Sequence, residues 1–111
     1  MAMIRVLSPV GVAAAEAFAV PTLPRNWSGL TVGFLDNTKA NFDRLTVEMA
    51  GLLRSSHGVA RVIHRRKANA STPAAPEIIA EMAKECDVVF AGSADCGSCM
   101  SWSLHDSIEI A

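Results

Sequence analysis

The stretch Leu30-Thr31-Val32-Gly33-Phe34-Leu35, followed at once by Asp36-Asn37-Thr38-Lys39, decides the expected fold. Residues 30–35 carry no charge and form an almost continuous apolar run, which is typical of a parallel strand buried on both faces. The polar residues 36–39 mark the carboxyl end of that strand. We therefore expect a buried strand that runs into a polar loop.

Strand and helix patterns alternate three times from residue 30 onwards. The apolar runs predict strands at 30–35, 59–63 and 87–91. Apolar residues at helical spacing predict helices at 41–54, from Pro76 onwards and at 99–110. This alternation predicts an α/β fold: a small three-layer sandwich whose parallel sheet has three to four strands joined by right-handed crossovers.

Residues 1–29 form a different kind of segment, an N-terminal arm that precedes the domain at 30–111. Met3–Leu7 is predicted to be a short strand and Ala13–Ala19 one or two helical turns, followed by an irregular stretch that contains Pro21 and Pro24. We expect the arm to pack on the core, on a partner subunit, or on both.

Composition excludes several classes of function. A chain of 111 residues with 50% hydrophobic residues is expected to form one globular domain. A net charge of -1 and the absence of Tyr argue against nucleic-acid binding. No apolar stretch reaches the roughly 18 residues of a membrane span, and residues 10–20 make a poor secretion signal. The expected location is the cytoplasm, where three cysteines favour catalytic thiols over a disulfide scaffold.

The segment Asp95-Cys96-Gly97-Ser98-Cys99 follows the third predicted strand and precedes the third predicted helix. Unpaired N–H groups and the positive dipole at a helix start stabilise a thiolate. The pattern indicates that Cys96 attacks and Cys99 resolves the resulting mixed disulfide. The alternatives are two structural cysteines, or half of a zinc site completed by His105 and Asp106. We expect no metal, and the lack of a Gly-X-Gly-X-X-Gly motif indicates no nucleotide cofactor.

Two further residues are catalytic candidates. Asp95 acts either as an acid/base partner of Cys96 or as a cap of the helix. His105 lies six residues after Cys99 and so not on the same helix face, which leaves it either a catalytic group or a structural one. Cys86 precedes the third strand, at the opposite end of the sheet, and is expected to be structural.

Ligands of parallel α/β sheets bind beyond the carboxyl ends of the strands, where three loops must meet. Their polar residues are expected to bind an anionic small molecule, although turn formation, helix capping or a solvated charge run explains each of them too. The predicted binding residues are Asp36, Asn37, Thr38, Lys39, Arg65, Arg66, Lys67, Ser71, Thr72 and Ser98.

Three motifs in order resemble the UGSC family, which is named for a selenocysteine-Gly-Ser-Cys motif and has cysteine-containing homologues. They are Leu35–Lys39, the basic run 65–67 with Ser71-Thr72-Pro73, and Ala94–Cys99 with His105-Asp106. The resemblance covers residues 30–110 and implies that Cys96 stands at the selenocysteine position, with Cys99 as the resolving thiol. Members of that family tend to continue into a further strand, which implies either that a partner chain supplies this edge or that the chain is a short subunit.

The leading hypothesis is a thiol-dependent oxidoreductase acting on an anionic or electrophilic small molecule. A second hypothesis is a non-redox lyase, isomerase or hydrolase that uses a cysteine thiolate. A third is a subunit of a larger enzyme that a partner chain completes. We expect a homo-oligomer or a hetero-subunit, with neither nucleic acid nor membrane as a partner.

Overall fold

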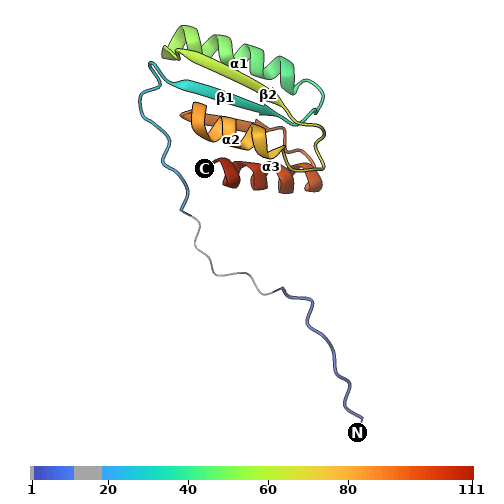
Figure 1. The fold of residues 1–111 in the computed structure, drawn as a ribbon. Helices are drawn as coiled ribbons and strands as arrows, with labels where there is room; N and C mark the ends of the chain where they lie inside the picture. The colour runs from blue at the N-terminus through green and yellow to red at the C-terminus, as the bar shows by residue number, and fades with distance from the viewer. Residues whose placement is uncertain (1, 12–18) are drawn as a thin grey trace.

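The computed structural model describes residues 2–11 and 19–111. Three parallel strands in the order β2-β1-β3 form one sheet, with α1 on one face and α2 and α3 on the other (Figure 1). The α/β prediction is therefore confirmed, with three layers. Along the chain the elements are β1 (Thr31–Asp36), α1 (Phe42–His57), β2 (Arg61–Arg66), α2 (Pro76–Glu85), β3 (Val88–Gly92) and α3 (Gly97–Ile110).

The central strand β1 separates two apolar clusters, because successive side chains of a strand point to opposite faces. Val32 and Phe34 face α1, where Phe34 stacks on Phe90 of β3 with ring centroids 5.5 Å apart. Leu35 faces the other way and packs with Met82 of α2. Four of these side chains are at most 1% exposed: Val32, Phe34, Leu35 and Met82. The core is therefore built on both faces of β1.

Several element boundaries differ from the sequence prediction. The second strand begins at Arg61 and includes the basic residues His64, Arg65 and Arg66, because its backbone pairs with β1 as far as Asp36↔Arg66. Charged side chains at a sheet edge do not prevent backbone pairing. The strand therefore extends three residues beyond the apolar run at 59–63 from which it was predicted. Helix α3 begins at Gly97, two residues before the prediction.

The prediction of a strand at Met3–Leu7 is wrong, since these residues pair with no strand of the described chain. The predicted helical turns at Ala13–Ala19 fall, for residues 13–18, outside the described residues.

The sheet order fixes where a site can form. β1 connects to β2 on one side, and the chain then crosses to β3 on the other side of β1. In such sheets the crevice at the carboxyl ends, where the strand order reverses, is the usual ligand site. The loops at 37–41 and 93–96 both begin at this place. Within the described ranges no helix has the length and apolarity needed to cross a bilayer.

Gly33 in β1 gives a test of the packing between the sheet and α2. A Cβ atom added there would lie 2.7 Å from the sulfur of Cys86 and 3.2 Å from Val89, whereas one added at Gly51 in α1 would meet nothing within 4 Å. Overpacking of this kind costs about 1–3 kcal/mol. We expect Gly33→Ala to lower the free energy of unfolding in urea by that amount.

The matched control is Gly51→Ala. It should raise the free energy of unfolding by up to ~1 kcal/mol, because alanine is the better residue inside an exposed helix. Equal stabilities of the two variants would contradict the close approach of Cys86 to Gly33.

Candidate active site

The two cysteines of the motif lie at the N-terminus of α3 and differ sharply in exposure. Cys96 is the N-cap residue and is exposed, whereas Cys99 in the first turn is only 2% exposed. They form a disulfide with their Cα atoms 5.3 Å apart, and the Cys99 N–H donates to the Cys96 sulfur at 3.4 Å. The exposed member of the pair is thus the predicted attacking residue, and the buried member is the predicted resolving residue.

The helix end favours negative charge on sulfur. The first turn of α3 contains no acidic residue, and the acceptor that caps it is the Cys96 sulfur rather than the Asp95 carboxylate. A sulfur at this position faces the unpaired N–H groups and the positive end of the helix dipole. The structure therefore removes helix capping as the role of Asp95.

Asp95 instead forms an ion pair between the loop after β3 and the loop after β1. Its exposed carboxylate lies 3.3 Å from the Lys39 ammonium group, which belongs to the loop after β1. The cation offsets the negative charge that Asp95 would otherwise place beside Cys96. Asp95 and Lys39 therefore belong to the surroundings of the cysteine pair.

Asn37 joins the loop after β1 to the loop that carries the cysteines. Its side chain is 1% exposed and donates from Nδ2 to the Ser93 carbonyl at 2.6 Å, while its backbone N–H donates to the Gly92 carbonyl at 2.9 Å. Burial leaves Asn37 no access to substrate. It positions the loop that leads to Cys96, a different role from the predicted one in binding.

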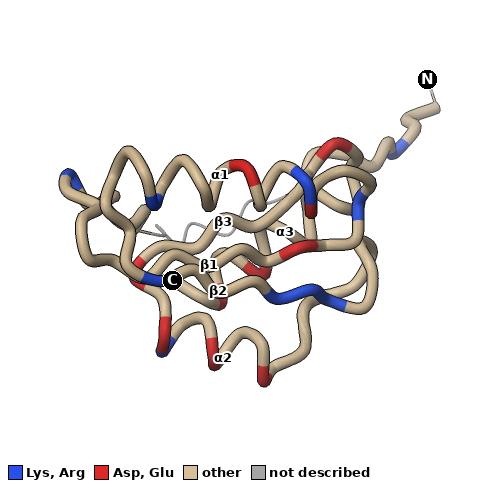
Figure 2. The backbone as a smooth tube through the Cα atoms, turned by 90° about the horizontal axis from the view of Figure 1, so that it is seen from above, with Lys and Arg blue, Asp and Glu red and all other residues tan. Residues whose placement is uncertain are grey.

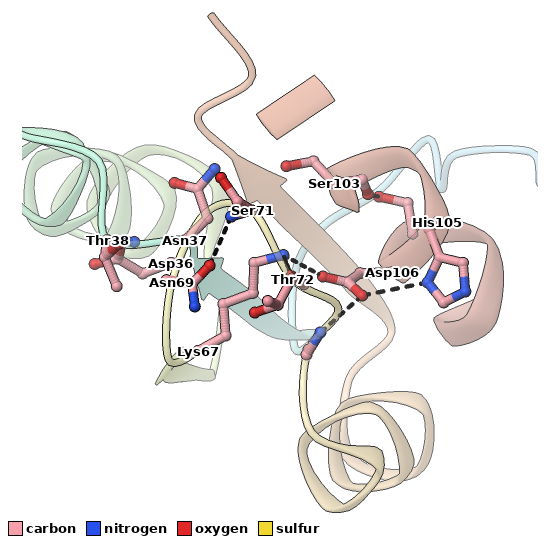
Figure 3. A network of polar contacts seen from close by, with 12 residues as sticks. Asp36, Asn37, Thr38, Lys67, Asn69, Ser71, Thr72, Ser103, His105 and Asp106 are labelled. Carbon is pink, nitrogen blue, oxygen red and sulfur yellow. Dashed lines mark hydrogen bonds and ion pairs between the residues drawn. The ribbon is translucent and has the colours of Figure 1, made fainter. Parts of the chain in front are cut away.

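A buried ion pair joins the loop after β2 to α3 (Figure 3). The Lys67 ammonium group donates to Asp106 Oδ2 at 2.6 Å and to the Thr72 carbonyl at 2.9 Å, and the Ala74 N–H donates to Asp106 Oδ1 at 2.9 Å. Lys67 and Asp106 are 3% and 0% exposed. The loop after β2 also meets the end of β1, where the Lys67 N–H donates to the Asp36 carbonyl at 2.9 Å, and Asn37 joins that end of β1 to the loop after β3, so the three predicted loops do converge. The Lys67 ammonium group is paired in the core and is not free to hold an anion.

A second buried carboxylate, Asp36, lies at the end of β1. Its Oδ1 accepts from the Thr38 N–H at 2.7 Å, and its buried Oδ2 accepts no hydrogen bond from the described residues. The nearest cation candidate is His64 of β2, whose Nε2 is 3.5 Å from Oδ2. Sequence reasoning missed His64; the signal that could have found it is its place two residues from the end of the neighbouring parallel strand.

The other basic residues of β2 divide between a helix and solvent. Arg65 lies on the α2 side and pairs with Glu81, and this hydrogen-bonded pairing lowers the pKa of Glu81 and raises that of Arg65. Arg66 is exposed at the end of the strand. Figure 2 shows these basic residues along β2, with acidic residues on α2 next to them.

The remaining candidates lie at the surface. His105 is half-exposed, packs edge-on to Trp102 at 5.4 Å and places Nδ1 3.5 Å from Asp106 Oδ1. Thr38 is half-buried with a positive φ of 75°. Ser71, Thr72 and Ser98 are exposed, and Thr72 contributes its backbone carbonyl to Lys67.

Only one group of three potential metal ligands occurs in the part of the chain that the structure describes: Asp95, Cys96 and Cys99, with donor atoms within 4.8 Å of one another. The zinc site suggested by the sequence would also need His105 and Asp106 as ligands. Asp106 is not available for it, because both of its carboxylate oxygens already accept hydrogen bonds from Lys67 and Ala74. The sulfurs ligate metals as thiolates, so this group could hold an ion only when the disulfide is reduced.

The chain belongs to the UGSC family, whose model matches residues 5–111. The match begins well before the segment that carries the three motifs, and so includes most of the N-terminal arm. A search among curated proteins and one among solved structures found no match.

Breaking the buried ion pair should be costly. Lys67→Met leaves the Asp106 carboxylate in the core without its cation, and loss of one partner of a buried pair typically costs about 3–5 kcal/mol. We expect a loss of this size in the free energy of unfolding, measured with urea. Arg61→Met is the control, since it removes the exposed pair with Glu85 and should cost less than about 1 kcal/mol. Equal losses in the two variants would refute the structural role of Lys67.

Cys86 should be a slow nucleophile. Burial, the largest influence, raises the pKa of its thiol above the ordinary value of 9.0. A variant with Cys96→Ser and Cys99→Ser leaves Cys86 as the one cysteine of the chain. Because less thiolate is present at any pH below the raised pKa, we expect its alkylation at pH 8 to be slower in the folded protein than in urea, and to accelerate as the pH rises. Equal folded and unfolded rates would contradict this.

Proposed function

Starting from membership of the UGSC family, we propose that this protein is a thiol-dependent oxidoreductase in which Cys96 and Cys99 cycle between dithiol and disulfide. The observation that carries the proposal is the pairing of an exposed Cys96 with a buried Cys99 at the N-terminus of α3. A helix N-terminus stabilises the attacking thiolate, and burial protects the resolving thiol from outside reagents.

The reaction begins with the reduced pair. The Cys96 thiolate attacks a sulfur of a disulfide substrate, so that one S–S bond forms, the substrate S–S bond breaks, and one substrate half leaves as a thiolate that takes up a proton. Cys99, as its thiolate, then attacks the Cys96 sulfur and releases the second half as a thiol. Two electrons pass from the cysteine pair to the substrate, and an external dithiol reduces the Cys96–Cys99 disulfide again.

The substrate class is proposed from the charges around Cys96. Arg65 and Lys67 are held by Glu81 and Asp106, whereas Lys39 pairs with Asp95 of the cysteine loop and is therefore a cation beside Cys96. Lys39 and the helix N-terminus together favour a small molecule with a carboxylate or another anionic group. Asp95 shares Lys39 and opposes anions, so it selects against substrates of high negative charge.

The test uses an anionic aromatic disulfide that releases a coloured thiolate, with a dithiol as the reductant. We expect Cys96→Ser to lose at least 99% of turnover, because the attacking thiolate is gone. In the absence of the dithiol, reduced Cys99→Ser should react once and stop as a mixed disulfide on Cys96, seen by mass spectrometry of the intact protein, whereas the unaltered chain should go on to the Cys96–Cys99 disulfide.

Cys86→Ser is the matched control and should turn over like the unaltered protein. If Cys99→Ser turns over at the full rate and no reversible disulfide is found, the redox proposal fails. Fast single labelling of Cys96 under those conditions would then favour the non-redox cysteine enzyme, and carboxylate-bearing substrates for elimination or isomerisation would be tried next.

A further inference from the structure

The two edges of the sheet are protected very differently. β2 carries Arg61, His64, Arg65 and Arg66, and two of its arginines pair with glutamates of α2. Charged side chains on an edge strand discourage pairing with another chain. β3, with the sequence Val-Val-Phe-Ala-Gly at 88–92, has no charged residue, and its three middle residues are only partly buried. The β3 edge therefore lacks the usual protection.

An apolar hollow of about 650 Å³ lies beside the start of β3. Its walls include Val88 and Val89 of β3. They also include Leu104 and Ile108 of α3, which are 60% and 40% exposed. Residues 20–24 of the arm border it on another side. The hollow shares Val88 and Val89 with the unprotected edge. We call the two together the β3 groove: residues 88–92 with Leu104 and Ile108.

The arm carries the complementary feature. Met3, Ile4, Val6 and Leu7 are 80–98% exposed, and they form a stretch rich in β-branched and apolar residues. Figure 1 shows residues 2–11 away from the sheet and its helices, and the longest extent of the chain is 74 Å against 29 and 26 Å. Five residues, Met3–Leu7, match the five of β3 in length. The sequence pattern of a strand is thus present, but its own domain does not pair with it.

We infer that residues 3–7 of a second copy of this chain add as a strand to the β3 groove, with the two copies exchanging arms. In a reciprocal exchange about a two-fold axis, each arm covers the β3 edge of the other copy. No β3 edge is then left to bind a third chain. A net charge of -1 per copy opposes the approach very little. The family match over residues 5–111 shows that most of the arm belongs to the family's sequence pattern.

The first measurement is the mass of the full chain by size-exclusion chromatography with light scattering, under a reducing agent that excludes disulfide-linked pairs. We expect twice the 11.8 kDa of one chain. Val6→Asp in the arm and Ile108→Asp in the β3 groove should each raise the dissociation constant at least tenfold. Both residues are solvent-accessible within one chain, so the domain should keep its helical circular dichroism.

Leu52→Asp is the matched control, because Leu52 is an apolar residue 63% exposed on α1, away from the β3 groove. It should leave the dimer intact. A monomer at every concentration, or a dimer that Val6→Asp and Ile108→Asp do not weaken, would overturn the inference.

A mixing experiment separates exchange between copies from docking of an arm on its own domain. The Val6→Asp chain keeps an intact groove and the Ile108→Asp chain an intact arm, so an equal mixture can form one arm–groove contact. We expect the mixture to give a mixed dimer that is recovered through a tag on one chain, and a single chain with both substitutions to remain monomeric. If mixing restores nothing, the arm does not cross between copies and the inference fails.

Discussion

The buried ion pair between Lys67 and Asp106 is the constraint on which the site depends. A charge inside a protein is tolerated only when it is paired and hydrogen-bonded, and here the ammonium group also reaches the Thr72 carbonyl while the carboxylate accepts the Ala74 N–H. One contact thereby ties the loop after β2 to the helix that carries the cysteines. The position of α3 under the sheet, and so the place of its N-terminus, follows from that tie.

Asn37 supplies the second fixed point, at the other end of the site. Its amide holds the Ser93 carbonyl, so the chain leaves β3 along the end of β1 before it turns into α3. Between these two points the cysteine pair is presented with one sulfur outside and one inside. The asymmetry is a consequence of the helix: Cys96, as the N-cap, stands outside the first turn, and Cys99, three residues on, returns to the face that packs on β3.

Ion pairs occur both in the core of the domain and on its surface. Lys67 and Asp106 neutralise each other in the core, and Arg65 and Glu81 do so at the surface of α2. Beside the cysteines, Lys39 and Asp95 form a pair that is partly exposed to solvent. The strand β3 itself, residues 88–92, carries no charged side chain.

Local patterns were sufficient for the layered α/β architecture, because strand and helix periodicities depend on neighbours a few residues apart. They also located the cysteines at a helix start and the three loops at one edge, since parallel strands put their carboxyl ends together. The role of Lys67 was beyond them: a lysine after two arginines resembles a solvated run until Asp106, 39 residues later, lies against it. The same holds for the approach of His64 to Asp36 and for the burial of Asn37. From residue 30 onwards, local patterns therefore predict the strands, the helices and the place of Cys96 and Cys99 at a helix start, whereas the strand predicted at Met3–Leu7 does not form within the chain. Which polar side chains remain unpaired depends on the tertiary structure, because burial and pairing are set by residues distant in the chain.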